Sequence, residues 1–510
     1  MSTRRSWRWA AVVSAGVCIA ACGSSDPPSG AGPGNSSDEP GTQIDLSCDQ
    51  ASFGSAQWTA CETRNFAHVS EGPLESVNPM FAVAWQAQGL RNVAQWTARS
   101  VSDPSWLSPR SGNTVALPLC TTWALPCLGD PFRYPQSPGP NGEVFYDTEA
   151  EVTPVVFYDE GCARISGRIW TPRGDAATFP GIVIENGSVQ APEPLYWWAA
   201  QALVRAGYMV MTFDPRGQGR SDQQTPSGEL GSNFNQSVFW TGLVNAIDFF
   251  RSSSAQPYPH NITCADSYPT VVDAFNPDIA RLDADRLGIA GHSLGGIGVS
   301  VVQSYGAEGA DPWPGLIDAD NPVDAVVAWD GIYSTASGMA GNAGGNLLGS
   351  AAGSGLPMTV PHKPILGQNG EYGLTPTPFL SDPQSDLLIS NFRVWQAAGL
   401  PVIEQTIQGS SHYEWSPLPA FPSSSWCPEP ATDSCDGGRA QPFAEHYTVA
   451  WFDRWLKRPD EPGYATADAR LLDDEGAQGR LKYSFRYQSA RDFPTRDGER
   501  QYCEDIRRGC

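Results

Sequence analysis

The chain has 510 residues, of which 40% are hydrophobic and 17% are charged, so it can bury a large core and is not disordered as a whole. Its 32 basic and 55 acidic residues give a formal net charge of −23. Phosphate binding needs the opposite sign of charge, so the composition argues against nucleic acid as a partner.

Residues 1–21 are typical of an export signal. Arg4, Arg5 and Arg8 precede an apolar run that is too short to span a bilayer and that ends just before Cys22. The sequence Ile-Ala-Ala-Cys at this point resembles a bacterial lipoprotein signal, in which the cysteine becomes the lipidated first residue. We therefore expect an exported protein of the cell envelope, attached to the membrane through lipid on Cys22. Removal of three arginines and no acids would leave 29 basic and 55 acidic residues, a net charge of −26.

The cysteines predict disulfides. Of the 12 cysteines, Cys18 lies in the signal and Cys22 is the expected lipid site, which leaves ten, an even number in an exported chain. No CxxC motif or cluster of histidines indicates a metal site. Sequence alone does not fix the pairing, but the spacing suggests four pairs of near neighbours and one remaining pair. These pairs are Cys48–Cys61, Cys120–Cys127, Cys427–Cys435, Cys503–Cys510 and Cys162–Cys264.

The chain divides into a tether, an extension, a main domain and a tail. Residues 22–47 are rich in Gly, Pro and Ser and predict a flexible tether. Residues 48–150 include apolar residues at helical spacing between 74 and 100, and we expect this extension to pack on the main domain. The main domain is expected at 151–460, followed by a C-terminal tail at 461–510.

Within the main domain, predicted strands alternate with predicted helices, the order that builds a mostly parallel sheet covered on both faces. Eight strands are predicted, at 152–160, 162–172, 180–186, 208–214, 286–291, 323–330, 362–372 and 401–409. Helices are predicted at 194–208, 237–253, from about 296, 385–399 and 443–458.

The pentapeptide Gly-His-Ser-Leu-Gly at 291–295 follows the apolar strand that ends at Ala290. A strand that turns into a helix within one or two residues strains the corner residue, so its neighbours two positions away must be almost free of side chain. Gly291 and Gly295 meet this need, and Ser293 stands at the corner. The pattern predicts a serine hydroxyl above the sheet edge, within reach of a base and of substrate, with the N–H of Leu294 at the start of the next helix.

Three motifs together resemble the α/β-hydrolases. They are GHSLGG at 291–296, FDPRGQGRSD at 213–222 and GSSHYEW at 409–415, which occur in the order and at the spacing of that superfamily. The second is similar to the D-x-R-G-x-G-x-S turn that many members carry after the fourth strand. The resemblance covers residues 152–458 and implies an α/β-hydrolase fold with an eight-stranded, mostly parallel sheet.

Serine needs a histidine base to act as a nucleophile, and the superfamily places the acid and then the histidine after the serine. His412 lies in a loop after an apolar strand, where the superfamily places its base. His362 and His446 also follow Ser293, but the second falls inside the last predicted helix. His292 fills the variable position of the pentapeptide, and we expect it to pack against the sheet.

Several carboxylates are candidates for the acid that orients the histidine. Glu371 lies at the end of the seventh predicted strand and resembles the carboxylate that the superfamily carries there, so it is the preferred candidate. Asp330 ends the sixth predicted strand, a position that a minority of members use. Asp382 and Asp386 are the remaining alternatives.

The oxyanion hole is expected to combine the N–H of Leu294 with that of Ser188 in the loop after the third strand. Many members have His-Gly in this loop, where this chain has Asn186-Gly187. Asp214 and Arg216 are interpreted as a structural charge pair that braces the loop after the fourth strand.

Four tryptophans near these motifs suggest an aromatic wall for an acyl or aromatic ester substrate. They are Trp197, Trp198, Trp329 and Trp415. The segment between Cys427 and Cys435 is a candidate cap over the pocket.

The sequence therefore predicts a serine hydrolase that cleaves carboxylic esters of a small molecule, lipid or polymer and acts as a monomer without cofactor or metal. Lipase-like, dienelactone-hydrolase-like, cutinase-like and carbohydrate-esterase branches all remain open. A peptidase or amidase with the same three residues is one alternative. A catalytically silent hydrolase fold that serves as a binding lipoprotein is the other.

Overall fold

The computed structural model describes ten segments of the chain. They are residues 46–76, 145–188, 191–219, 221–231, 235–268, 272–336, 356–374, 379–416, 440–474 and 483–510. The expected lipid site at Cys22 and the predicted disulfides Cys120–Cys127 and Cys427–Cys435 lie outside these segments, as does the helical pattern at 74–100 after its first three residues. In the described part of the chain, no helix has the length and apolar character needed to cross a membrane.

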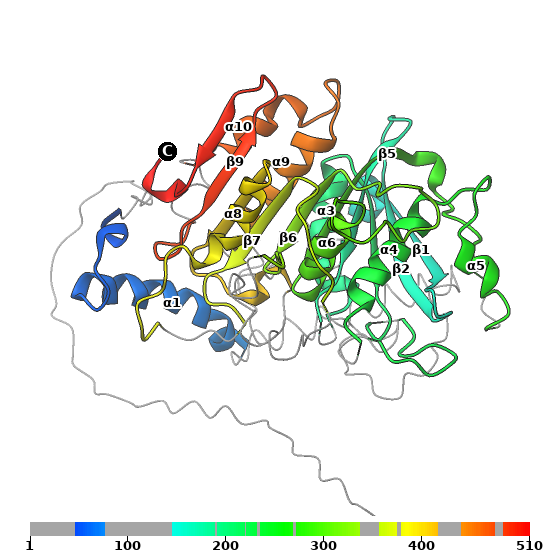
Figure 1. Ribbon diagram of the computed structural model, residues 1–510, viewed down its shortest axis with the longest axis horizontal. Coiled ribbons are helices and arrows are strands. Elements are labelled where there is room, and N and C mark those ends of the chain that lie inside the picture. Colours follow the sequence, from blue (N-terminus) through cyan, green and yellow to red (C-terminus); the bar gives the residue numbers. More distant parts are fainter. Residues whose placement is uncertain are drawn as a thin grey trace, which may run out of the picture. The chain divides into compact units, whose positions relative to one another are not determined.

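A single ten-stranded sheet organises the described residues (Figure 1). Its strands are β1 (Ala150–Tyr158), β2 (Arg164–Pro172), β3 (Phe179–Glu185), β4 (Met209–Asp214), β5 (Leu282–His292), β6 (Ala325–Trp329), β7 (Ile365–Gly370), β8 (Val402–Ile407), β9 (Ala490–Pro494) and β10 (Arg500–Cys503). They lie in the order β1-β2-β4-β3-β5-β6-β7-β8-β9-β10.

The six strands from β4 to β8 in this order are parallel, and β2 is antiparallel to both of its neighbours. This strand order, with helical crossovers between the parallel strands, is that of the α/β-hydrolase fold, so the predicted fold class is confirmed. Because parallel strands end at the same edge, residues that follow β5, β6 and β8 come together there.

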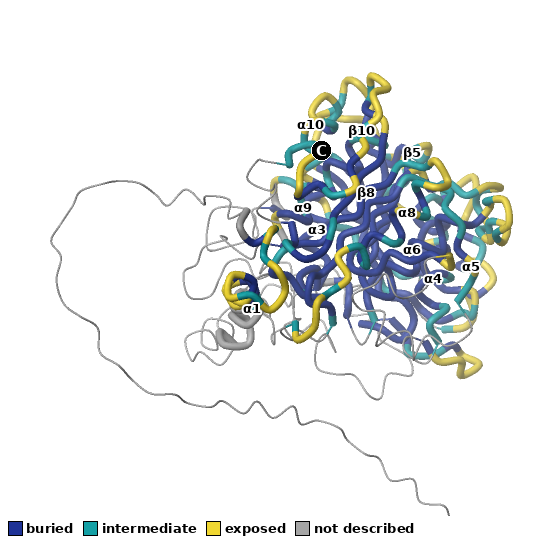
Figure 2. Tube along the Cα trace, turned by 60° about the vertical axis from the view of Figure 1, so that its left-hand side comes forward, coloured by how far each residue is buried: buried dark blue, intermediate teal, exposed yellow. Residues whose placement is uncertain are grey.

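Helices cover both faces of the sheet. The longer helices are α1 (Ala56–Ser76), α3 (Trp197–Arg205), α4 (Val238–Arg251), α6 (Leu294–Ser304), α8 (Ser390–Ala397) and α9 (Ala440–Leu456), and two short ones are α5 (Pro259–Thr263) and α10 (Ala467–Leu471). Helices α3 and α9 pack in one buried cluster, and α4, α6 and α8 in another. β3, β4, β6, β7 and β8 are buried along their length, as is β5 from Leu287 onward, and exposed residues lie mostly in the connecting loops (Figure 2).

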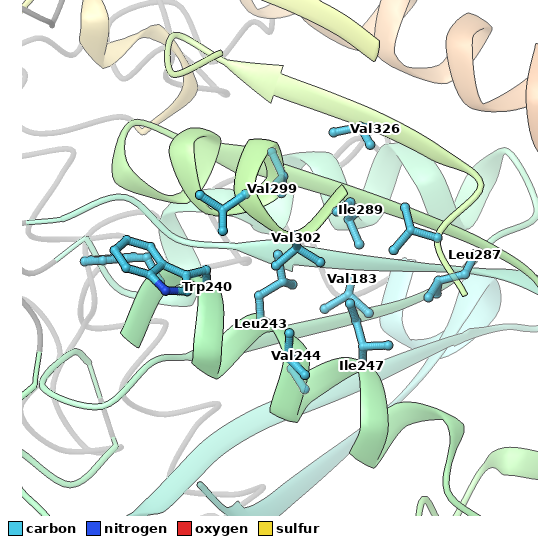
Figure 3. Packing of buried hydrophobic residues seen from close by; sticks show 14 of the residues in the cluster. Val183, Trp240, Leu243, Val244, Ile247, Leu287, Ile289, Val299, Val302 and Val326 are labelled. Atoms are coloured by element: carbon cyan, nitrogen blue, oxygen red, sulfur yellow. The ribbon is translucent and has the colours of Figure 1, made fainter. Parts of the chain in front are cut away.

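The alternation of side chains along the strands separates these two clusters. In β3, Ile182 and Ile184 belong to the α3–α9 cluster, whereas Val183 between them faces the other one. Figure 3 shows Val183 and Ile289 of the neighbouring strand packed against residues of α4 and α6, among them Leu243. Both faces are apolar, which explains why these strands have continuous hydrophobic runs.

The sheet has ten strands where eight were predicted, because the C-terminal tail adds two. β9 pairs antiparallel with β8, and β10 pairs antiparallel with β9. The segment 461–510, expected to be a tail, therefore extends the central sheet.

Three of the five predicted disulfides fall on described residues, and all three are confirmed. They are Cys48–Cys61, Cys162–Cys264 and Cys503–Cys510. Cys162–Cys264 joins the turn between β1 and β2 to the end of α5, and Cys48–Cys61 fixes the first turns of α1 to the segment before it.

Candidate active site

Ser293 stands in a sharp turn between β5 and α6, as predicted. Its backbone has φ 58° and ψ −121°, a conformation that residues with side chains rarely adopt. A Cβ atom on Gly291 would lie 2.3 Å from the carbonyl oxygen of Gly295, and one on Gly295 would lie 2.3 Å from that of Asn186. Both glycines are therefore required for the turn that presents Ser293.

Asp330 directly follows β6 and is the residue against which His412 is held. Its φ of 44° is also positive, which among described residues other than glycine is shared only by Cys162 and Ser293. Asp330 Oδ1 accepts a hydrogen bond of 2.8 Å from the N–H of Gly370, and Oδ2 contacts His412 Nδ1. The backbone and the neighbouring strand thus fix this carboxylate toward the imidazole.

His412 begins a 3₁₀ helix, His412–Trp415, that follows the loop after β8. Its backbone N–H donates to the carbonyl of Gly373 at 3.0 Å, and Ser411 Oγ caps the 3₁₀ helix by accepting from the N–H of Tyr413. With Nδ1 on the carboxylate, Nε2 is the ring nitrogen left for a substrate or nucleophile. Serine, aspartate and histidine thus follow β5, β6 and β8 at one sheet edge, and all three side chains are buried.

The prediction that Glu371 contacts His412 is wrong. The Glu371 carboxylate pairs with the Arg486 guanidinium at 3.2 Å and accepts hydrogen bonds from the Gly409 N–H at 2.7 Å and from the side chains of Asn65 and Ser484. Its charge is therefore compensated by partners in α1 and in the C-terminal segment.

Glu371 does not reach His412 because of how the chain packs at Gly370, one residue earlier. A Cβ atom there would lie 2.8 Å from the carbonyl carbon of Ser411 and 3.1 Å from the N of His412. The loop that carries His412 therefore packs directly on the end of β7, while Glu371 points to the other side and holds that loop at Gly409.

The remaining candidates have other surroundings. Asp382 is exposed, and Asp386 forms a half-exposed ion pair with Arg393. His362 is partly buried beside α6, and its N–H donates to Gln303 Oε1. His446 is packed on α9, as expected, with Nε2 next to the carbonyl of Arg470.

The loop after β3 lies against the nucleophile turn. A Cβ atom on Gly187 would be 3.2 Å from the Cβ atom of Ser293. The N–H of Gly187 itself donates to Tyr196 Oη at 2.8 Å. The following amide, that of Ser188, is therefore the next candidate to donate to an oxyanion. The N–H of Leu294 belongs to the first turn of α6, where amides have no acceptor within the helix. The roles of Leu294 and Ser188 in an oxyanion hole stay predictions.

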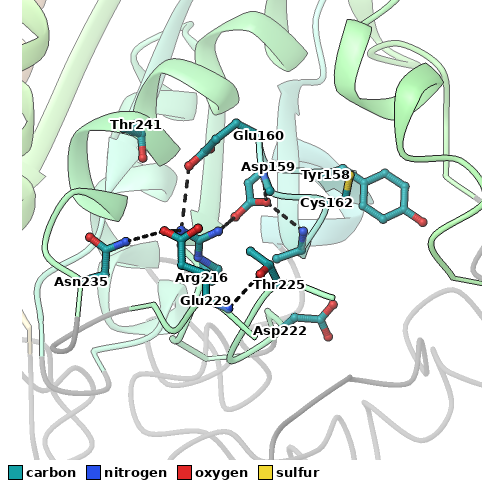
Figure 4. Close-up of polar contacts among 12 residues, drawn as sticks. Tyr158, Asp159, Glu160, Cys162, Arg216, Asp222, Thr225, Glu229, Asn235 and Thr241 are labelled. Carbon is teal, nitrogen blue, oxygen red and sulfur yellow. Dashed lines mark hydrogen bonds and ion pairs between the residues drawn. The ribbon is translucent and has the colours of Figure 1, made fainter. Parts of the chain in front are cut away.

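Arg216 and Asp214 both brace the loop after β4, but with different partners from the pair that was expected. Arg216 forms a buried ion pair of 2.9 Å with Asp159, in the turn after β1, and reaches Glu229 on its other side (Figure 4). Asp214 accepts hydrogen bonds from the side chain of Asn186 and, at 2.7 Å, from the N–H of Glu193. Both residues thus hold neighbouring loops in place.

The four tryptophans expected to line the pocket are core residues instead. Each is at most 1% exposed: Trp197, Trp198, Trp329 and Trp415. Trp198 Nε1 donates to the carbonyl of Trp415, and Trp329 Nε1 donates to Thr448 on α9. They pack between the sheet and the α3–α9 layer, so they carry no information about the substrate.

Two polar residues next to Ser293 and His412 were not singled out as site residues from the sequence. His292 was expected to pack against the sheet, but its ring nitrogens contact Tyr196 Oη at 2.9 Å and the carbonyl oxygen of His412 at 2.8 Å. Nothing in the sequence around Tyr196 indicated this contact. A histidine inside an otherwise apolar turn did require hydrogen-bond partners, and that signal could have been used.

Comparisons with known proteins add little to what this geometry shows. No family model matches the sequence, and no curated protein matches it. Among solved structures, an acylaminoacyl peptidase of Pyrococcus horikoshii matches with a TM-score of 0.38 and 14% identity. The match covers 65% of this chain and 45% of the peptidase chain, so less than half of that protein is represented here.

Proposed function

We propose that this protein is a serine hydrolase that cleaves carboxylic esters through an acyl-enzyme. The observation that carries the proposal is the contact of Asp330 with His412 Nδ1 at the sheet edge where Ser293 occupies its strained turn. Strain of this kind persists only where surrounding structure over-determines it, and it concentrates at functional sites.

Each residue then has a defined role. His412 Nε2 accepts the proton of the Ser293 hydroxyl as the oxygen attacks the carbonyl carbon, and it returns that proton to the leaving alcohol. Asp330 holds the imidazole in the tautomer with the proton on Nδ1 and stabilises the imidazolium. The amides of Leu294 and Ser188 would donate to the oxyanion. Water, activated by His412, then releases the acid.

The ester reading is preferred over a peptidase or amidase on chemical grounds alone, because an alcohol leaves more readily than an amine. The same three residues can serve both reactions. The experiment is therefore hydrolysis of p-nitrophenyl esters of increasing acyl length beside an aminoacyl anilide. Faster turnover of the anilide would favour a peptidase over an esterase. If the folded wild-type protein hydrolysed neither substrate, a binding protein would remain.

A fluorophosphonate probe tests the nucleophile itself. One adduct per chain is expected, and Ser293→Ala should abolish it. The control is Ser304→Ala, which removes another buried serine of α6 whose hydroxyl donates to the carbonyl of Val301. An adduct on any residue other than Ser293 would end the proposal.

We also propose that the protein is exported and lipid-anchored through Cys22. The three disulfides support an oxidising compartment. Metabolic labelling with palmitate should label the chain, and Cys22→Ser should remove both the label and the membrane association. Unlabelled wild-type protein in the envelope would contradict lipidation but not export.

A further inference from the structure

Tyr196 and His292 connect three parts of the candidate site through one line of hydrogen bonds. The N–H of Gly187 lies 2.8 Å from Tyr196 Oη, Tyr196 Oη lies 2.9 Å from His292 Nδ1, and His292 Nε2 lies 2.8 Å from the carbonyl oxygen of His412. The line therefore runs from the loop expected to supply the oxyanion hole, through the residue before Ser293, to the backbone of the base.

The two outer bonds of this line have fixed directions. The carbonyl of His412 can only accept, so His292 donates from Nε2–H, and the N–H of Gly187 can only donate, so Tyr196 Oη accepts there. In the neutral form of His292 the proton is then on Nε2, and Nδ1 accepts the proton of the Tyr196 hydroxyl. This is the opposite tautomer to that expected for His412.

The surroundings of His292 favour this neutral form. The side chains of His292 and Tyr196 are at most 2% exposed, and the His292 ring packs against the rings of His412 and Trp415. Burial, with the neighbouring His412 ring as a smaller cause, lowers the pKa of His292 well below its usual value. Burial raises the pKa of the Tyr196 hydroxyl, which keeps its proton available for donation.

We propose that Tyr196 and His292 are positioning residues, which hold the loop at Gly187 and the backbone of His412 in register with Ser293. The proposal rests on the serine-hydrolase function proposed above. Asp330 contacts the ring of His412, and His292 contacts the backbone carbonyl of His412. Both the side chain and the backbone of His412 are therefore held in place. Misplacement of reacting groups by about 1 Å can cost ~100-fold in rate, which is the scale of effect expected here.

The tautomer can be read without any activity. In protein labelled with ¹⁵N-histidine, the His292 resonances, identified by their loss in His292→Gln, should show a protonated Nε2 and an unprotonated Nδ1 at pH 7. A proton on Nδ1, or an imidazolium, would overturn the proposed hydrogen-bond line, whatever the enzyme hydrolyses.

The positioning role is tested by a split between kcat and KM. Tyr196→Phe removes the donor to His292 Nδ1 and the acceptor for Gly187 and should lower kcat by about 10- to 100-fold, with KM changed by less than about twofold. His292→Leu should lose at least as much kcat. His292→Gln can still donate to the carbonyl of His412 and should recover part of it.

Tyr208→Phe is the matched control. Tyr208 is as buried as Tyr196 and its hydroxyl donates to Asp453, but it precedes β4 at the opposite edge of the sheet. It should lose stability and keep kcat. If Tyr196→Phe kept full kcat in folded protein, the positioning role would fail and the hydrolase proposal would stand. If wild-type Ser293 did not react with fluorophosphonate, the function itself would fail and the positioning role with it.

Discussion

At the scale of single residues, the two carboxylates Asp330 and Glu371 are separated by what surrounds them. Asp330 is held by the Gly370 amide and faces the His412 ring, whereas Glu371 faces Arg486. We predict that Asp330→Asn lowers kcat by up to about 10⁴-fold with little change in fold, because the imidazole loses the partner that fixes its tautomer and stabilises its charge. Steady-state kinetics on a p-nitrophenyl ester checks this.

Glu371→Gln is the comparison for Asp330→Asn. It should destabilise the protein, since Arg486 loses part of its compensating charge, yet folded protein should keep most of its kcat. A loss of kcat in Glu371→Gln as large as in Asp330→Asn would return Glu371 to the acid position and contradict the assignment.

The positions of Ser293 and His412 could be predicted from the sequence because both depend on local signals. The glycines around Ser293 are needed for a turn of five residues, and His412 follows its strand within one loop. The acid depends on how the loop of His412 packs on Gly370, which is a contact between segments about 40 residues apart and leaves no local pattern. An aspartate before Gly331 did carry one signal, because Asp-Gly at the end of a strand favours a positive φ.

At the scale of secondary-structure elements, a buried charge cluster attaches α1 to the sheet. Arg486 pairs with Glu371 and with Glu62 of α1, and Asn65 of the same helix donates to Glu371. We predict that Arg486→Met costs about 3 to 5 kcal/mol in the free energy of unfolding, because two buried carboxylates lose their counter-charge. Urea denaturation measures this loss, and proteolysis should cut near α1 before the rest of the chain.

Arg393→Met provides the control for Arg486→Met. Arg393 and its partner Asp386 are 47% and 48% exposed, and ion pairs of this kind contribute at most about 1 kcal/mol. Equal losses in the two variants would show that the buried cluster does not hold α1.

The disulfide Cys162–Cys264 closes the longest loop of the three, with a sequence separation of 102 residues. In the chain-entropy model it restrains the unfolded chain by about 4.7 kcal/mol, against ~2.4 kcal/mol for the separation of seven residues in Cys503–Cys510. The double variant Cys162→Ser/Cys264→Ser should therefore unfold at clearly lower denaturant than Cys503→Ser/Cys510→Ser. The reverse order would contradict the entropic origin of the difference.

The elements missed by sequence reasoning are those with little hydrophobic pattern. β9 and β10 have the short sequences ARDFP and RQYC, and β10, which lies at the sheet edge, is charged as edge strands commonly are. Helix α1 attaches partly through buried polar contacts, which hydrophobic periodicity does not detect, and partly through ring contacts such as that of Phe66 with Tyr372. The inner strands were predicted because burial on both faces requires continuous apolar runs.

At the scale of the whole molecule, the stability should depend on pH through carboxyl groups that folding buries. Glu404 lies in β8, and burial raises its pKa to about 8, although the N–H of Phe392 and the side chain of Asn369 donate to it. Burial likewise raises the pKa of Asp248 on α4 to about 6. In the unfolded chain, carboxyl groups lose their protons near pH 4.

Between about pH 4 and 8, the folded state therefore holds protons that the unfolded state releases. Stability contributed by these groups is fully present below the unfolded pKa and is lost as pH rises through the folded pKa, so the protein should be more stable at pH 5.5 than at pH 8. A single such group contributes at most about 1.4 kcal/mol per pH unit. Glu404→Gln should flatten the part of the profile between about pH 6 and 8, and Glu308→Gln, which removes an exposed carboxylate, should not. Urea midpoints across this range test the prediction, and a profile that rose toward pH 8, or that was unchanged in Glu404→Gln, would contradict it.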